Sequence, residues 1–308
     1  MARAWASGLL LAALGCAPAD GPAYCAADRA AGALIVLDRG LVELERVPCA
    51  SPRALLGSGA ALWLAHGAED EVRPTRLARL DEHARARCEL VFRGLCDLAP
   101  WDDDGLLALD ETSPELGRLW RVDGRGRRRL LGEFARPRAV AARPGAALVG
   151  CAVGELFLLA EDGGVRATGA LGGAVLDLAP ASAPGTWWAL WQEHEPRLAW
   201  LGPALDVRWS CLLARDARAC LAEAGDLGAW VSDGHSARRV GPESDEARLE
   251  LDPGGALQPA LLDGARALYL APGALFAVEA RGRELALSAS QGGFSGLCAL
   301  APLRVSGR

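Results

Sequence analysis

The 308-residue sequence contains no lysine and no asparagine, and its only isoleucine is Ile35. Without lysine the chain has no side-chain amine for a Schiff base, and without asparagine it can form neither an Asn-Gly turn nor a metal site with an asparagine ligand. Its 33 basic residues, all arginine, stand against 39 acidic residues, for a formal net charge of −6. Nucleic-acid-binding proteins carry the opposite balance, so we expect no nucleic-acid partner.

The sequence has no apolar run long enough to span a membrane. Its first residues contain Arg3, then a short apolar stretch, Gly8–Leu14, and then Cys16 between small residues. This order resembles a bacterial lipoprotein signal, in which the cysteine carries lipid once the preceding residues are removed. The resemblance implies a signal peptide at 1–15 and a lipidated Cys16 with a tether at 16–30. We expect a cell-envelope protein that meets the membrane only through this lipid anchor; ordinary secretion is the alternative.

The other eight cysteines include no Cys-x-x-Cys pair, which removes support for zinc-ribbon, thioredoxin-like and c-type haem sites. Export permits disulfides, and Cys25 and Cys49 are the favoured bridge partners. Cys96 and Cys298 occupy the same place in two copies of a Gly-Leu-Cys-x-Leu-Ala-Pro motif. We interpret these two as small buried thiols of inner strands.

A repeat of about forty residues runs through the chain. Its clearest piece places a leucine inside a short apolar run that ends at an acidic or glycine turn. The leading leucines are Leu34, Leu77, Leu119, Leu156, Leu198 and Leu275, with a fainter copy near Arg238 to Val240. Other short apolar runs and turn residues fill each unit, so that each unit is predicted to hold four strands. Helical periodicity is scarce.

Four strands in each unit of this length are typical of a β-propeller blade. Residues 33–47 supply only the last two strands of a unit and Gly296–Arg308 only the first two, so the two ends together predict one shared blade. We therefore predict an all-β propeller across 31–308, with seven blades of four antiparallel strands; six or eight blades are the alternatives, because the fifth unit is irregular. The layout resembles the NHL/YVTN and quinoprotein-like propeller group, without the signature sequence of any one family.

In a propeller, the turns between second and third strands share one face of the ring with the links between blades. These turns are predicted to be acidic, and those between third and fourth strands basic. The first set holds the predicted binding rim, Glu69, Asp70, Glu71, Glu193, Glu195 and Asp233, together with Asp110, Glu111 and Glu115. The second set holds Arg39, Arg85, Arg87, Arg125, Arg127, Arg128 and Arg129. A cation or basic partner at the acidic rim is one interpretation, and solvated turns are the other.

Three histidines, His66, His194 and His235, fall in equivalent turns of the acidic rim and form the only set that predicts a divalent-metal or acid–base site. No other cofactor is indicated. Lactonases related to gluconolactonase use an asparagine ligand that this chain lacks. Streptogramin-lyase-like propellers use a His and Glu pair around magnesium, which here implies His235, or His194 with Glu193 or Glu195.

Six of the ten tryptophans, Trp187, Trp188, Trp191, Trp200, Trp209 and Trp230, are interpreted as packing between blades. The sequence thus favours a non-catalytic, monomeric propeller that binds a protein or envelope component on a rim. The alternatives are a metal-dependent lyase or lactonase-like enzyme at the acidic rim and a sensor that binds sugars on the tryptophans.

Overall fold

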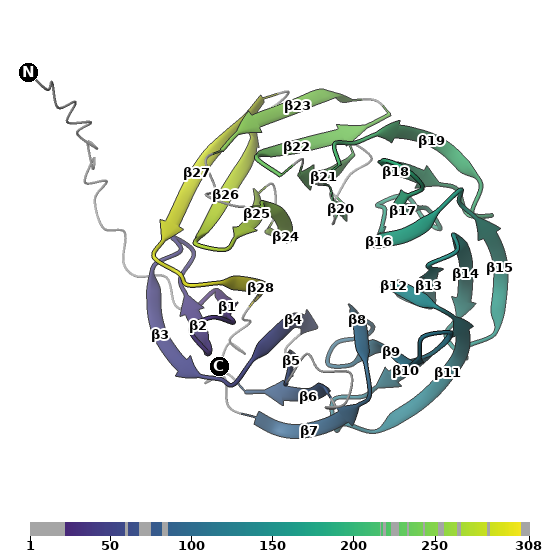
Figure 1. Ribbon diagram of the computed structural model, residues 1–308, viewed down its shortest axis with the longest axis horizontal. Coiled ribbons are helices and arrows are strands. Elements are labelled where there is room, and N and C mark those ends of the chain that lie inside the picture. Colours follow the sequence, from purple (N-terminus) through teal and green to yellow (C-terminus); the bar gives the residue numbers. More distant parts are fainter. Residues whose placement is uncertain are drawn as a thin grey trace, which may run out of the picture.

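The computed structural model describes residues 22–58, 61–67, 75–81, 86–215, 217, 220–222, 228–232, 234–242, 244–251, 256–263, 266–281 and 284–302. Within these ranges the regular secondary structure is entirely β-strand, and they contain no helix that could span a membrane. The strands form seven four-stranded antiparallel sheets around a central axis (Figure 1). The predicted seven-bladed β-propeller is confirmed.

In every blade the first strand lies nearest the ring axis and the fourth lies on the perimeter. The composite blade contains β28 (Leu297–Pro302), β1 (Tyr24–Asp28), β2 (Ala33–Leu37) and β3 (Glu43–Pro48). Blade 1 contains β4 (Pro52–Ser58), β5 (Ala61–His66), β6 (Thr75–Leu80) and β7 (Ala86–Phe92). Blade 2 contains β8 (Leu95–Pro100), β9 (Leu106–Ser113), β10 (Leu116–Val122) and β11 (Arg128–Ala135). Blade 3 contains β12 (Pro137–Arg143), β13 (Ala146–Cys151), β14 (Glu155–Ala160) and β15 (Val165–Ala170).

The remaining blades follow the same order. Blade 4 contains β16 (Ala174–Pro180), β17 (Trp187–Gln192), β18 (Pro196–Leu201) and β19 (Val207–Leu212). Blade 5 contains β20 (Cys220–Ala222), β21 (Ala229–Ser232), β22 (Ser236–Gly241) and β23 (Ser244–Glu250). Blade 6 contains β24 (Gln258–Asp263), β25 (Arg266–Ala271), β26 (Ala274–Arg281) and β27 (Glu284–Gly292).

Burial changes across each blade as the sequence pattern requires. The second and third strands lie between two neighbouring blades, and strands such as β2 and β13 are buried along their whole length. The outermost strands meet solvent on one side, and β15 and β19 alternate between exposed and half-buried positions. Continuous apolar runs therefore mark the middle of a blade, and alternating runs mark its perimeter.

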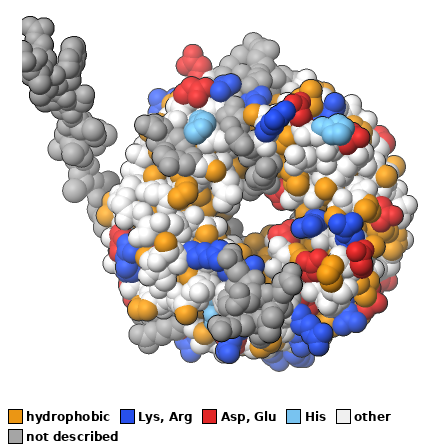
Figure 2. All heavy atoms as spheres, viewed as in Figure 1, with side chains coloured by type: hydrophobic (Ala, Val, Ile, Leu, Met, Phe, Trp, Pro, Cys, Tyr) orange, Lys and Arg blue, Asp and Glu red, His pale blue; other side chains and the backbone are white. Residues whose placement is uncertain are grey.

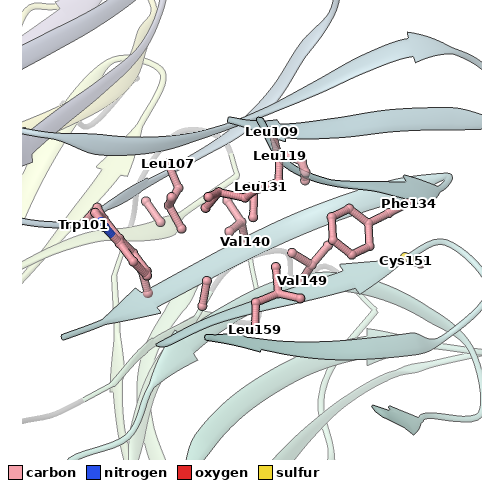
Figure 3. Packing of buried hydrophobic residues seen from close by; sticks show 13 residues of the cluster. Trp101, Leu107, Leu109, Leu119, Leu131, Phe134, Val140, Val149, Cys151 and Leu159 are labelled. Atoms are coloured by element: carbon pink, nitrogen blue, oxygen red, sulfur yellow. The ribbon is translucent and has the colours of Figure 1, made fainter. Parts of the chain in front are cut away.

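The core consists of apolar layers between adjacent blades rather than one central mass. Between blades 2 and 3, Leu107, Leu119, Val140 and Val149 pack together (Figure 3). In the same layer the rings of Phe134 and Phe157 are 5.3 Å apart. Trp187, Trp188 and Trp230 are buried in the equivalent layers between blades 3 and 4, 4 and 5, and 5 and 6, respectively. The interpretation of these tryptophans as packing residues is confirmed.

The ring closes in the composite blade, where β1 pairs antiparallel with β28 from Tyr24↔Pro302 to Asp28↔Leu297. Asp28 is fully buried, and its carboxylate accepts hydrogen bonds from the backbone N–H groups of Ala31 (2.9 Å) and Ser295 (2.8 Å). One side chain thus ties the amino-terminal and carboxyl-terminal segments together.

The shared blade was predicted, but its division was wrong in detail. The amino-terminal segment supplies three strands and the carboxyl-terminal segment one, instead of two each. The difference arises at β1, which lies in the segment assigned to the tether. Its residues Tyr24–Asp28 are all buried, so the propeller begins before residue 31. The cysteine interpretation also needs correction, because Cys96 is exposed, Cys298 is half-buried, and Cys25 and Cys49 are free thiols.

Candidate functional site

The innermost strands surround an axial channel. Figure 2 shows it open on the face that carries the exposed histidines, which we call the upper face. The turns between second and third strands, such as Glu193–Glu195 between β17 and β18, lie on this face. The channel contains a cavity of about 470 Å³, lined by residues of β4, β8, β12, β16, β24 and β28. Most of these are leucine, alanine or proline, and two, Asp97 and Asp177, carry carboxylates. Apolar walls with a few polar groups are typical of a small-molecule site.

Asp97 links blade 2 to blade 3 at the channel wall. One carboxylate oxygen accepts a hydrogen bond from the N–H of Leu98, and the other from the N–H of Val140 in β12, both at 2.8 Å. Innermost strands are sheet edges whose channel-side N–H groups lack a strand partner, and Asp97 supplies an acceptor for one of them. Desolvation by burial, and secondly the negative charge of Asp177, raise the pKa of Asp97 to about 7.

Asp177 occupies the equivalent place in β16. It accepts a hydrogen bond from the N–H of Leu178 (2.9 Å), as Asp97 does from Leu98, and both follow a register shift in their strands. An Asp-Leu-Ala-Pro run ends both strands, and β28 ends in Ala299-Leu300-Ala301-Pro302. Sequence reasoning aligned the copies at Cys96 and Cys298 but missed the two aspartates. Comparison of the copies at Asp97, Asp177 and Ala299 would have found them.

A second cavity of about 220 Å³, which we call the cleft, adjoins the channel between blades 1 and 2. Arg53, Thr75, Leu95 and Cys96 line it at strand ends that reach the upper face, and it shares Leu55, Leu56, Asp97 and Leu98 with the channel. Arg53 is the extra residue at a β-bulge in β4, and its guanidinium donates a hydrogen bond to the Thr75 hydroxyl at 3.0 Å. The sequence pattern identifies Arg53 only as part of an inner strand.

Cys96 is the thiol nearest to this site. Although Cys96 has solvent-exposed surface, the surrounding protein partly desolvates its thiol at the cleft wall; this desolvation, and secondly the negative charge of Glu111, raise the pKa of Cys96 to about 12. The thiolate is the nucleophilic form of cysteine, and at neutral pH this group is almost entirely the thiol. Cys96 therefore lacks the activation that a catalytic nucleophile requires.

The structure does not bring the three predicted metal ligands together. The ring of His66, at the end of β5, lies 3.0 Å from one carboxylate oxygen of Glu89 in β7, and the other oxygen accepts a hydrogen bond from Arg76 (3.0 Å). His194 and His235 are exposed in the turns of blades 4 and 5. Figure 2 shows the histidine side chains widely separated on the upper face. No three His, Cys, Asp or Glu side chains in the described residues are placed to hold a metal ion.

The predicted acidic rim is only partly described. Glu193 and Glu195 are exposed beside His194, and Glu195 lies 4.0 Å from Arg215. Glu69, Asp70, Glu71, Asp233 and the lipidation residue Cys16 lie outside the described residues. Figure 2 shows arginine as well as acidic side chains around the channel mouth, so the described residues of this face carry charges of both signs.

On the opposite face, several of the predicted basic residues have local partners. Arg87 lies 3.0 Å from Asp81, and Arg127 lies 2.6 Å from Asp123 within one turn. The guanidinium of Arg128 stacks over the rings of Phe92 and Trp120. Arg85 is outside the described residues. Arg87 and Arg127 thus pair within their own turns, whereas Arg128 also contacts Phe92 of the neighbouring blade 1.

Comparison with known proteins supports the fold and no closer relationship. No family model and no curated protein matches the sequence. Among solved structures, a protein described as a candidate 6-phosphogluconolactonase from Bacteroides uniformis has a TM-score of 0.70 at 9% identity, covering 91% of this chain and 98% of that chain. Apo AztD from Citrobacter koseri has a TM-score of 0.61 at 13% identity, covering 91% and 97%.

Hsv2 from Kluyveromyces marxianus has a TM-score of 0.62 at 7% identity, covering 88% of this chain and 98% of that chain. All three are β-propeller proteins, and identities this low carry the fold alone. The chain is therefore a seven-bladed β-propeller whose candidate site is the channel and the adjoining cleft.

Proposed function

We propose that the protein is a non-catalytic, monomeric binding propeller of the cell envelope that takes its ligand at the upper mouth of the channel. The observation that carries this proposal is the continuity of the channel with the cleft, which gives one apolar site with a few polar groups around it. The protonated Cys96 and the separated histidines favour binding over catalysis. The ligand is either a free small molecule or a group that belongs to a protein or another envelope component.

A small-molecule screen tests the proposed site directly. Ligand-observed NMR with mixtures of carboxylates, amines and sugars is expected to give compounds that bind the wild type and are lost in Leu261→Trp. Leu261 is half-buried in the channel wall, and a larger side chain there fills the cavity. Leu287→Trp, on the exposed perimeter strand β27, is the control. Absence of any compound whose binding depends on Leu261 would refute the proposal.

Metal analysis and a lactone-hydrolysis assay separate this function from the enzymatic alternative. We expect purified protein to contain no stoichiometric divalent metal and to leave lactones intact. A stoichiometric ion that disappears in His194→Ala or His235→Ala, together with hydrolysis, would overturn the non-catalytic proposal.

The location is proposed from the amino-terminal sequence alone. If Cys16 carries lipid, the mature protein partitions into the detergent phase, and Cys16→Ser moves it to the aqueous phase. Wild-type protein that stays in the aqueous phase would contradict the anchor and favour simple secretion.

A further inference from the structure

The cleft contains a cation with no anionic partner in the described part of the chain. Arg53 is half-buried, and there it donates to the neutral Thr75 hydroxyl and forms no ion pair. Charged groups removed from water are normally paired, because desolvation penalises the isolated charge. The other arginine at a bulge of an innermost strand, Arg138 of β12, is exposed to solvent instead.

We propose that the cleft binds the carboxylate of a small aliphatic acid through Arg53 and Thr75; this inference rests on the proposed binding function. A guanidinium presents parallel N–H donors that match a carboxylate, and the buried Thr75 hydroxyl lies beside it. Arg53 is the one cation among the described lining residues, which favours a monoanion over a phosphate dianion.

The walls define the rest of the ligand. Ala54, Ala65 and Leu95 line the cleft, whereas Leu55, Leu56 and Leu98 line both the cleft and the channel. An acid held at Arg53 therefore extends its hydrocarbon chain along these shared leucines toward the axial cavity. The carboxylate of Asp97, which would repel an acid, is hydrogen-bonded to Val140 on the blade 3 side of its strand.

Calorimetric titration with hexanoate tests the assignment, with hexylamine as a probe of the same length and opposite charge. We expect the wild type to bind hexanoate and not hexylamine, and Arg53→Gln to weaken hexanoate binding by about tenfold or more, because a charge-assisted pair is lost. Arg138→Gln is the matched control and should bind as the wild type does. Thermal melting checks that each variant is folded, and Thr75→Val provides a second, uncharged test with a smaller loss.

A peptide with an apolar carboxyl terminus, compared with its amidated form, separates the two sources of a carboxylate. Hexanoate binding that depends on Arg53, without discrimination between the peptides, assigns the site to free acids; discrimination with no hexanoate binding overturns that assignment. Equal hexanoate binding by wild type and Arg53→Gln, or an equal loss in Arg138→Gln, also overturns it. If the Arg53 assignment fails but other compounds still bind in a way that depends on Leu261, the proposed binding function stands. Failure of the assignment and failure of the proposed function are therefore distinguishable.

Discussion

At the scale of single residues, Asp97 shows how an unpaired N–H group at the edge of an innermost strand obtains a hydrogen-bond acceptor. The Asp97 carboxylate, on a bulged strand, accepts hydrogen bonds from one backbone N–H group of its own blade and one of the next blade. It therefore links two blades whose strands form no sheet hydrogen bonds with each other. The same position thus links two blades and gives the channel one of its few ionisable groups.

The titration of Asp97 predicts a pH dependence of stability. Its pKa is raised from an ordinary value of 3.8 to about 7 in the folded protein, chiefly by desolvation and then by Asp177. The folded state holds this proton more tightly than the unfolded state, so the contribution is complete below about pH 4 and is lost as pH rises toward 7. The melting temperature of the wild type should therefore fall more between pH 5 and pH 8 than that of Asp97→Asn.

Asp97→Asn retains the shape of the side chain but removes the titration, so the comparison isolates one group. Its amide offers one acceptor oxygen to two N–H donors, so a lower melting temperature at every pH is expected as well. Identical slopes for the two proteins would contradict the assignment.

At the scale of strands and turns, glycines allow the tight connections at the blade ends. In the turn between β14 and β15, Gly163 has φ of 94°, and a Cβ atom there would lie 2.5 Å from the carbonyl oxygen of Leu131 in blade 2. The turn therefore requires glycine both for its own backbone conformation and for close contact with the neighbouring blade.

Gly163→Ala is expected to lower the free energy of unfolding by more than about 1 kcal/mol, because strain and a backbone clash add. Gly145→Ala is the matched control: Gly145 also has positive φ, 77°, but a Cβ atom there meets nothing within 4 Å. Urea unfolding should show the smaller loss in Gly145→Ala, and equal losses would show that the Leu131 contact is unimportant.

The repeat predicted the number of blades and their strand order because each blade buries similar apolar runs. The short Tyr24–Asp28 strand was not predicted, because its few apolar residues follow a segment rich in proline and alanine.

The candidate site was less predictable from the sequence than the fold. Arg53 and Asp97 are more than one repeat apart in the sequence, and they line the same cavity only because blades 1 and 2 pack side by side. The histidines occupy equivalent turns, but the ring places these turns far from one another.

At the scale of the whole molecule, the composite blade is the point on which the ring depends. Its innermost strand comes from the far end of the chain, and Gly57 of β4 packs so closely against it that a Cβ atom there would lie 2.7 Å from the ring of Pro302. Loss of β28 therefore removes both a strand partner of β1 and the wall against which blade 1 packs.

Truncation after Gly296 should abolish cooperative thermal unfolding and promote aggregation, because the edge of β1 becomes available for pairing with other chains. Truncation after Pro302 keeps the whole of β28 and should melt as the full chain does. Circular dichroism and size-exclusion chromatography measure both outcomes, and a monomeric, cooperatively folded chain ending at Gly296 would contradict the requirement for β28.

The position of β28 in the chain also has a consequence for biosynthesis. β1 is made before the strands of the six other blades and its partner β28 after them, so the paired strands β1, β2 and β3 lack their inner neighbour while those blades are synthesised. Ring closure therefore requires that synthesis has passed β28, and a product that stops before this strand carries an open edge that chaperones and proteases can recognise.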